Sequence, residues 1–383
     1  MRLRVAPRPR VALRPDERVT TLELFFDLVF VLTITQLTDV VHADPGVVGL
    51  GIAFLILVNI WWMYSGYAWL TNNVSTATLP RRLLLLVAMG AFLVMAIATP
   101  HAFGSSGLAF GLAYLVVVAV HFAMFRMAFA AESTRAVLGT APYNFASALL
   151  LVAAGFVDGV ADWWLWGAAV AVHIAMLEIR RSGGYAVRAA HFVERHGVVL
   201  IVALGESVVA LGLGIGDQSL TSPLVFAAVL GLSLAAALWW LYFAENERLA
   251  ERALDGALAG RAGRVGVVAF GYAFTALLMG IVVGSAGLKD VFAHPYGQVE
   301  LGGALLLAGG CALYILGIAI FRRAVGAVGP RGLLVHAAAI VLAALTTLVG
   351  DYGSGLAQTL VLVALLLGLS FATRSPDRTT GAR

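Results

Sequence analysis

Long apolar segments separated by short polar ones fill the chain from residue 22 to residue 372. Twelve of them are near the roughly 20 residues that a helix needs to span a bilayer. Since the bilayer core offers the backbone no water, and the segments lack the two-residue alternation of barrel strands, each is predicted to be a helix. Pro142, Tyr143 and Asn144 interrupt the fifth. The helices are expected at residues 22–41, 47–70, 82–101, 107–130, 136–157, 162–178, 192–213, 222–243, 264–287, 299–321, 332–350 and 355–372.

Composition supports the same class of protein. The chain is 61% hydrophobic and 12% charged, with a mean hydropathy of +0.93, whereas soluble globular domains are about 25% charged. The predicted fold is therefore all-α and polytopic, an integral membrane protein with about 12 transmembrane helices. Cys311 is the single cysteine, so the sequence offers neither a disulfide framework nor a cysteine-based metal site. No metal and no cofactor are expected.

The arginines predict the orientation of these helices. When the N-terminus is placed inside, all arginines fall in segments on that side, and the only lysine, Lys289, falls on the other. Cytoplasmic loops carry an excess of Lys and Arg, so both termini are predicted to be cytoplasmic in a bacterial plasma membrane. The positive charge is then explained by the orientation of the helices in the membrane, and no nucleic-acid partner is expected.

An internal similarity suggests a duplication. NIWWMYSGY at residues 59–67 resembles ALWWLYFAE at residues 237–245, and a carboxylate precedes each Trp pair in the previous helix, Asp27 and Glu206 respectively. Two six-helix repeats would then be related by an axis along the membrane normal. The alternative is that tryptophans collect at membrane interfaces independently of any repeat. The predicted divisions are a cytoplasmic tail (1–21), a first repeat (22–178), a second repeat (179–373) and a cytoplasmic C-terminal tail (374–383).

Glu23, Asp27 and Glu206 are carboxylates inside the apolar segments. Glu23 and Asp27 are four residues apart, so they share one face of a helix. An Asp at the centre of a spanning helix costs about 2.5 to 3.5 kcal/mol, whereas a Leu, Ile, Phe or Val contributes only about 0.3 to 0.6 kcal/mol. Glu206 follows Arg195 by eleven residues, which places it roughly 16 Å into the membrane. It must face the bundle interior and pair with another group, meet water or stay protonated.

The eleven-residue spacing also predicts a polar seam on this helix. Arg195 and Glu206 lie on nearly the same face, as do His196 and Ser207. Intramembrane acids and histidines mark proton or cation paths, although polar residues also fix helix packing by bonding one another. The predicted partners, all within expected spans, are Asn59, His121, Arg126, Asn144, His173 and His336.

Two segments resemble a known family. ELFFDLVFVLTITQL at residues 23–37 and HFVERHGVVLIVALGESVVALG at residues 191–212 are similar to the bacterial low temperature requirement A (LtrA) family. The resemblance implies a many-helix plasma-membrane protein needed for growth in the cold, and it brings no substrate with it. The positions that match the family's motifs are Glu23, Phe25, Phe26, Asp27, Arg195, His196, Gly197, Gly205, Glu206 and Ser207.

Two classes of function remain open. Twelve helices, two repeats and an acid on the first helix of each repeat favour a transporter or channel for a small solute or ion, with the carboxylates as proton or cation sites. The alternatives are a membrane-embedded enzyme acting on lipid, and a membrane scaffold or sensor needed for growth in the cold. No HExxH or GxSxG motif and no His-rich cluster occurs in the sequence, so an enzyme is disfavoured. The expected partners are the lipid bilayer and a small solute or ion.

Overall fold

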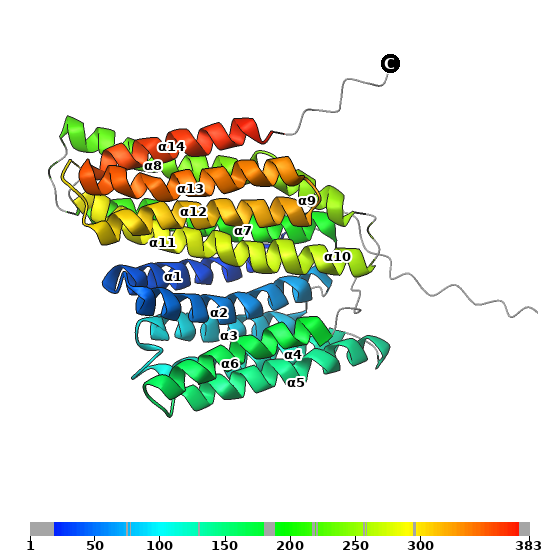
Figure 1. Cartoon of the computed structure of the whole chain (residues 1–383). Helices are drawn as coiled ribbons and strands as arrows, with labels where there is room; N and C mark the ends of the chain where they lie inside the picture. The colour runs from blue at the N-terminus through cyan, green and yellow to red at the C-terminus, as the bar shows by residue number, and fades with distance from the viewer. Residues whose placement is uncertain are drawn as a thin grey trace, which may run out of the picture.

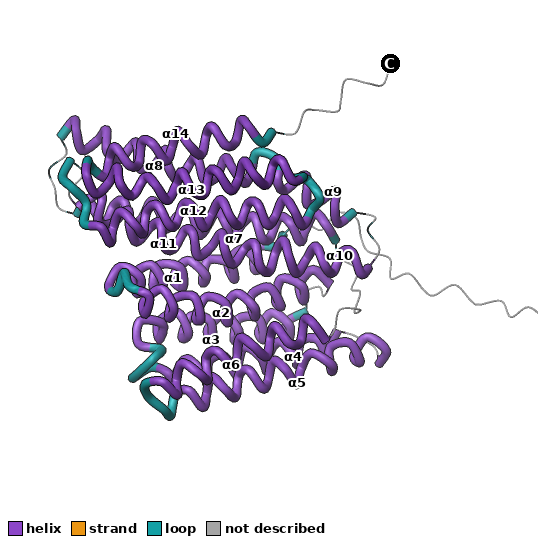
Figure 2. Tube along the Cα trace, in the orientation of Figure 1, coloured by secondary structure: helices purple, strands orange, loops and turns teal. Residues whose placement is uncertain are grey.

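Every regular element in the described part of the chain is a helix. The computed structural model describes residues 19–374 except 74, 75, 77, 129, 130, 180–187, 217, 218, 220, 256, 258, 294 and 295. The predicted N-terminal tail therefore lies almost wholly outside the described residues, as do Arg180 and Arg181. Figure 2 shows the helices as long, roughly aligned rods joined by short loops. The prediction of an all-α fold is confirmed.

The helices of the first half match the predicted segments to within a few residues, except that α5 begins five residues early. They are α1 (Thr21–Ala43), α2 (Val47–Asn73), α3 (Leu79–Ala98) with a 3₁₀ turn η1 (Thr99–His101), α4 (Gly107–Ala128), α5 (Ala131–Ala154) and α6 (Val160–Ile179). Those of the second half are α7 (Ala189–Ile215), α8 (Ser222–Phe243), α9 (Asn246–Leu254), α10 (Ala259–Val265), the π-helix η2 (Gly266–Ala273), α11 (Phe274–Ala293), α12 (Leu301–Ala324), α13 (Pro330–Tyr352) and α14 (Gly355–Ala372).

Most of these elements are long and apolar enough to cross a membrane. Eleven such helices occur among the described residues, counting α8 with α9 as one and α10, η2 and α11 as another. The helix that does not qualify is α5, which contains Pro142 and begins with polar residues. Large apolar side chains are exposed on the outer helix faces, among them Leu213 (59%), Leu232 (51%) and Leu345 (52%). This is the surface expected of a protein surrounded by lipid, and it confirms a multi-pass membrane protein with about 12 helices.

The start of α1 is fixed by its own sequence. Thr20 accepts a hydrogen bond from the backbone N–H of Glu23, and the Glu23 carboxylate accepts one from the backbone N–H of Thr20. This reciprocal capping box satisfies two donors that the first turn would otherwise leave free. Glu23 therefore has a structural task at the helix end in addition to any functional one.

The two halves of the chain meet at α1. Figure 1 shows α1 and α2 lying between α3 to α6 on one side and the helices of the second half on the other. Across this boundary α1 packs against α7 and α11, while α2 contacts α7, α11 and η2. The boundary is thus built mainly from α1, α7 and α11, and the predicted seam residues of α1 and α7 face it.

Contacts between helix ends define two ends of the bundle. Arg195 near the start of α7 reaches Thr71 near the end of α2, and Arg81 at the start of α3 reaches the carbonyl of Met127 in α4. Arg322 near the end of α12 reaches Thr373 after α14. We call this end the arginine end, and the opposite one, where α1 and α11 finish, the outer end. The grouping agrees with the predicted one-sided arginines, and its assignment to the cytoplasm is a prediction.

Candidate functional site

Four ionisable side chains are buried along the contact between α1 and α7. Glu23 and Asp27 come from α1, and Arg195 and Glu206 come from α7; each is at most 2% exposed. Regular backbone spacing places the two residues of each pair on one face, four residues apart on α1 and eleven on α7. The predicted polar seam is therefore a contact between two helices from different halves of the chain.

At the arginine end, side chains of α1 and α2 surround the guanidinium of Arg195. One guanidinium nitrogen, Nη2, lies 2.6 Å from Asp27 Oδ1, and the other, Nη1, donates to Thr71 Oγ1 at 2.6 Å. The Tyr64 hydroxyl also donates to Asp27 Oδ1 at 2.6 Å. Arg195 further lies 5.7 Å from the ring centroids of Phe26 and Tyr64, where the cation is attracted by the ring faces. Asp27 is thus paired with a cation and hydrogen-bonded.

Glu23 joins the same cluster from the preceding turn of α1. Its Oε1 lies 3.7 Å from Arg195 Nη1, and its Oε2 lies 3.4 Å from His191 Nε2. The other ring nitrogen of His191 lies 3.4 Å from Asn72 Nδ2. We call Glu23, Asp27, Tyr64, Thr71, His191 and Arg195 the inner site. With both carboxylates ionised, the inner site holds two negative charges and one guanidinium.

A second charged site lies toward the outer end. Glu206 Oε2 accepts a hydrogen bond from the Thr35 hydroxyl at 2.5 Å, and Glu206 Oε1 is buried without a hydrogen-bond partner. One turn farther along α1, Asp39 lies 2.6 Å from Lys289 Nζ of α11. We call Thr35, Asp39, Glu206 and Lys289 the outer site. Its buried carboxylate has fewer partners than either carboxylate of the inner site.

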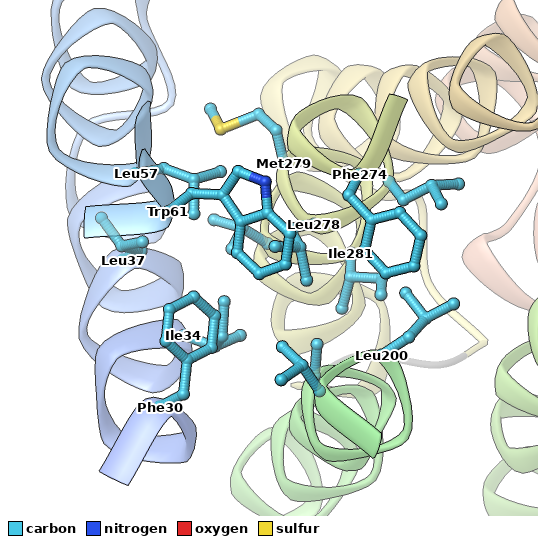
Figure 3. Packing of buried hydrophobic residues seen from close by; sticks show 14 of the residues in the cluster. Phe30, Ile34, Leu37, Leu57, Trp61, Leu200, Phe274, Leu278, Met279 and Ile281 are labelled. Carbon is cyan, nitrogen blue, oxygen red and sulfur yellow. The ribbon is translucent and has the colours of Figure 1, made fainter. Parts of the chain in front are cut away.

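An apolar layer separates the two sites. Phe30 and Ile34 of α1 and Leu200 of α7 lie between the charged positions on their helices and are at most 3% exposed. Figure 3 shows these three side chains together with Trp61 of α2 and Phe274 of α11. We call Phe30, Ile34 and Leu200 the apolar plug. Asp27 and Glu206 therefore occupy different sites, although both face the protein interior as the sequence predicts.

His196 and Ser207 face α11 and η2 rather than α1. The His196 ring packs at 4.8 Å from Phe270 and 5.4 Å from Phe274 between centroids, and its Nδ1 lies 2.8 Å from its own helix at the Phe192 carbonyl. Its Nε2 is buried without a partner. Ser207 lies 3.0 Å from Ser285 of α11. This second face of α7 is mainly a packing surface.

The irregular backbone of η2 also contacts this region. The indole N–H of Trp61 lies 3.1 Å from the carbonyl oxygen of Phe270 and 3.3 Å from that of Gly271, both within the π-helix. π-Helical turns leave carbonyls turned out of the regular ladder and are frequent at functional sites. Trp61 thereby ties α2 to η2 directly beside the apolar plug.

The other predicted partners lie away from the seam. Asn59 and His336 bond carbonyls of their own helices, at Leu55 and Gly332. His121 packs against Tyr67 and Phe125, and Arg126 is exposed at the end of α4. None of these four joins the inner or the outer site through a described hydrogen bond or ion pair. Spacing along one sequence did not reveal which helices are neighbours.

His173 and Asn144 belong to a separate polar network inside the first half. His173 Nε2 lies 2.9 Å from Ser147 Oγ and 3.1 Å from the Tyr114 hydroxyl. Trp62 stacks on the His173 ring at 4.6 Å, and its indole N–H donates to Asn144 Oδ1 at 3.1 Å. These contacts join α2, α4, α5 and α6, and they fix helix packing.

Six residues of the two sites were not among the sequence candidates: Thr35, Asp39, Tyr64, Thr71, His191 and Lys289. Tyr64 lies in the aromatic motif at residues 59–67, and His191 precedes Arg195 by one helical turn, so both carried a signal. Lys289 was visible as the only lysine. Thr35 and Thr71 had no distinguishing pattern. No group of three or more His, Cys, Asp or Glu side chains able to hold a metal ion occurs among the residues that the structure describes.

Comparison with known proteins gives a match over nearly the whole chain. The profile of a family described as bacterial low temperature requirement A protein (LtrA) matches residues 18–367. A relative from Rhizobium meliloti (strain 1021), described as uncharacterized protein RA0937, is 28% identical over 324 residues, which cover 79% of this chain and 76% of the relative. No solved structure matches.

Proposed function

The chain belongs to the bacterial low temperature requirement A family, and from this premise we propose that it transports a small solute or ion across the plasma membrane. The proposed path follows the contact between α1 and α7. The inner site would serve the cytoplasmic side and the outer site the external side. The apolar plug between them would prevent continuous passage in the state described by the structure.

The arrangement of the two charged sites carries this proposal. A charged residue inside the bilayer is expensive and marks an ion or substrate pathway by default. Packing accounts for Asp27, because its Oδ1 pairs with Arg195 and accepts a hydrogen bond from Tyr64, although its Oδ2 is buried without a hydrogen-bond partner. It accounts less well for Glu206, which has one hydroxyl partner, a buried Oε1 without a hydrogen-bond partner and, among the described residues, no ion pair. A carboxylate kept in such a place is typical of a site that binds and releases a cation or proton.

The location between two halves of the chain also favours transport. In many secondary transporters the substrate and ion sites lie near the midplane, where repeats meet. Within the first half α1 contacts α2 and α3, α3 contacts α4, α4 contacts α5, and α2 and α5 contact α6. The second half has the corresponding neighbours: α7 with α8 and α11, α11 with α12, α12 with α13, and α8 and α13 with α14. This parallel supports a six-helix duplication.

The contacts between the two halves do not show the same correspondence as the contacts within each half. A two-fold axis would pair the α1–α11 contact with one between α7 and α3, and no extensive α7–α3 contact occurs among the described residues. The Trp pairs also differ, since Trp61 is 2% exposed whereas Trp239 and Trp240 are 41% and 43% exposed. The duplication is therefore proposed for the fold of each half and not for a symmetric boundary.

Flux through reconstituted protein tests the proposal. Purified protein in lipid vesicles would be screened with small ions and amino acids, with and without a pH gradient. We expect uptake of at least one solute class that depends on the gradient and that Glu206→Gln reduces or uncouples. Vesicles with the Arg126→Gln variant serve as the control, because Arg126 is exposed and away from both sites. Gradient-independent leakage that is equal in all vesicles would contradict a transport role.

Orientation can be tested with single engineered cysteines. Cys311 is 2% exposed, so it should give little background labelling. A membrane-impermeant thiol reagent added to intact cells should label Tyr352→Cys at the outer end and leave Arg374→Cys at the arginine end unlabelled until the cells are opened. The reverse labelling would place the arginine end outside.

A further inference from the structure

Lys289 occupies an unusual place for the only lysine of the chain. It lies at the outer end, away from the arginines, and its side chain is only 8% exposed, whereas the side chain of its partner Asp39 is 48% exposed. A half-exposed carboxylate is solvated and needs no buried cation beside it. The burial of Lys289 therefore indicates a role for its charge deeper in the protein.

Glu206 lies within reach of the Lys289 ammonium. Thr35, which donates to Glu206, precedes Asp39 by one turn of α1, and residues spaced in this way lie about 5 to 6 Å apart at their Cβ atoms. The α11 helix that carries Lys289 packs along α7, and Ser285, one turn before Lys289, lies 3.0 Å from Ser207, the residue after Glu206. Since a lysine side chain is a flexible four-carbon stem, a change of rotamer can move the ammonium from Asp39 toward Glu206.

The donor set around Glu206 suits a proton better than a metal cation. Hard metal cations take about six oxygen ligands. Glu206 meets one hydroxyl, that of Thr35, and the backbone carbonyls of α1 and α7 are engaged in regular helices here. The Lys289 ammonium in the same region would repel a metal ion. A proton needs only the unpartnered Oε1.

We infer that the ion bound at Glu206 is a proton and that Lys289 is the internal counter-ion that replaces it. This inference rests on the proposed transport function and names its coupling ion. With the proton bound, Glu206 is neutral and Lys289 pairs with Asp39, as in this structure. When Glu206–COOH gives its proton to water, the Lys289 ammonium moves to the new carboxylate and leaves Asp39 to solvent. The buried region stays neutral in both states.

Few other charges act on this exchange. On α1 the groups facing Glu206 are Thr35 and Asp39, and on α11 the group is Lys289. The His42–Asp290 pair, 3.5 Å apart at the outer end, is exposed by 40% and 37% and is solvated. The described α8 helix, which also packs on α7, brings no charged side chain to this level. The counter-ion role therefore falls on Lys289 alone.

Infrared difference spectroscopy of the protein in lipid vesicles tests the inference without any solute. The C=O band of protonated Glu206 is identified by its loss in Glu206→Gln, and its pH midpoint is measured in each variant. We expect Lys289→Gln to raise the midpoint by about 1 to 3 pH units, the effect of removing a nearby opposite charge. Lys289→Arg should retain the wild-type midpoint within about one unit. Asp39→Asn should lower the midpoint because it frees Lys289 for Glu206.

The outcomes for the counter-ion exchange are distinct from those for transport. An unchanged midpoint in a folded Lys289→Gln protein, or loss of the band on adding sodium at fixed pH, would overturn the inference. If Lys289→Gln does not fold, Asp39→Asn decides, because an unshifted midpoint in that variant would equally overturn the inference. A shifted midpoint in protein that moves no solute would instead refute the transport proposal and leave the counter-ion exchange standing.

Discussion

The inner and outer sites lie on the same pair of helices but hold their charges differently. At the inner site, Asp27 is bound by a guanidinium and a hydroxyl, each at 2.6 Å, and the guanidinium binds further side chains. Asp27 Oδ2 and Glu206 Oε1 are both buried without a hydrogen-bond partner, but at the outer site Glu206 has a single hydroxyl partner and, among the described residues, no paired cation. A network with several partners fixes its members in one charge state and one geometry. A carboxylate with one partner can change its protonation at small structural cost.

This difference separates two explanations of buried charge. Buried ion pairs add little net stability compared with apolar residues, yet removal of one partner is strongly destabilising. The inner site therefore fixes α1, α2 and α7 in register, and its charges depend on one another. Glu206 forms no such ion pair among the described residues, and its described hydrogen bond is to the Thr35 hydroxyl. The comparison thus assigns anchoring to the inner site and titration to the outer one.

The largest expected effect comes from breaking the inner ion pair. Arg195→Met leaves Asp27 buried beside Tyr64 with no cation, so we expect a loss of about 3 to 5 kcal/mol in the free energy of unfolding. It would appear as reduced folded protein in membranes and a lower Tm in detergent. Arg126→Met, at an exposed arginine, is the control and should change the Tm little. A loss below about 1 kcal/mol in Arg195→Met would remove the anchoring role.

A double substitution tests whether Asp27 and Arg195 depend on each other. Asp27→Asn combined with Arg195→Met removes both buried charges, so it should be less destabilising than Arg195→Met alone. The measurement is a double-mutant cycle on the Tm and on chemical unfolding. Strictly additive effects of the two substitutions would mean that the pair at 2.6 Å is not coupled.

An effect of at most similar size is expected at the apolar plug. Leu200→Ala removes most of a fully buried side chain between the two sites. It should lower the free energy of unfolding by about 2 to 5 kcal/mol, and by less if neighbouring side chains fill the cavity. It should also raise proton leakage through vesicles, because water can enter the space. Leu362→Ala in α14, equally buried and far from the seam, should lose similar stability without leakage. Equal leakage in both variants would contradict a plug between the sites.

The smallest effect concerns the second face of α7. Ser207→Ala removes a 3.0 Å hydrogen bond to Ser285, and interhelical bonds of this kind average about 0.6 kcal/mol in membranes. We expect a small drop in Tm and an unchanged pH profile of transport. A lost pH profile in Ser207→Ala would move the titrating site from the contact between α1 and α7 to the contact between α7 and α11.

The sequence predicted the elements and the buried charges better than their partners. Hydropathy located the spans because the hydrophobicity of a segment depends only on the residues of that segment. The burial of Asp27 and Glu206 followed from the cost of exposing a carboxylate to lipid, and the shared face of Arg195 and Glu206 followed from helix geometry. The partners depend on which helices are neighbours in the bundle, and no single-helix pattern contains that information. His121 and His336 were therefore candidates and His191 was not, although of these three only His191 reaches Glu23.

Transport by Glu206→Gln protein in vesicles tests the central claim most directly. Gln keeps the size of Glu and can accept the Thr35 hydrogen bond, but it cannot titrate. We predict that Glu206→Gln folds and inserts like the wild type, while its solute flux becomes independent of pH. An unchanged pH profile in Glu206→Gln, together with failure of Glu206→Leu to fold, would show that Glu206 is a packing residue and would contradict the account.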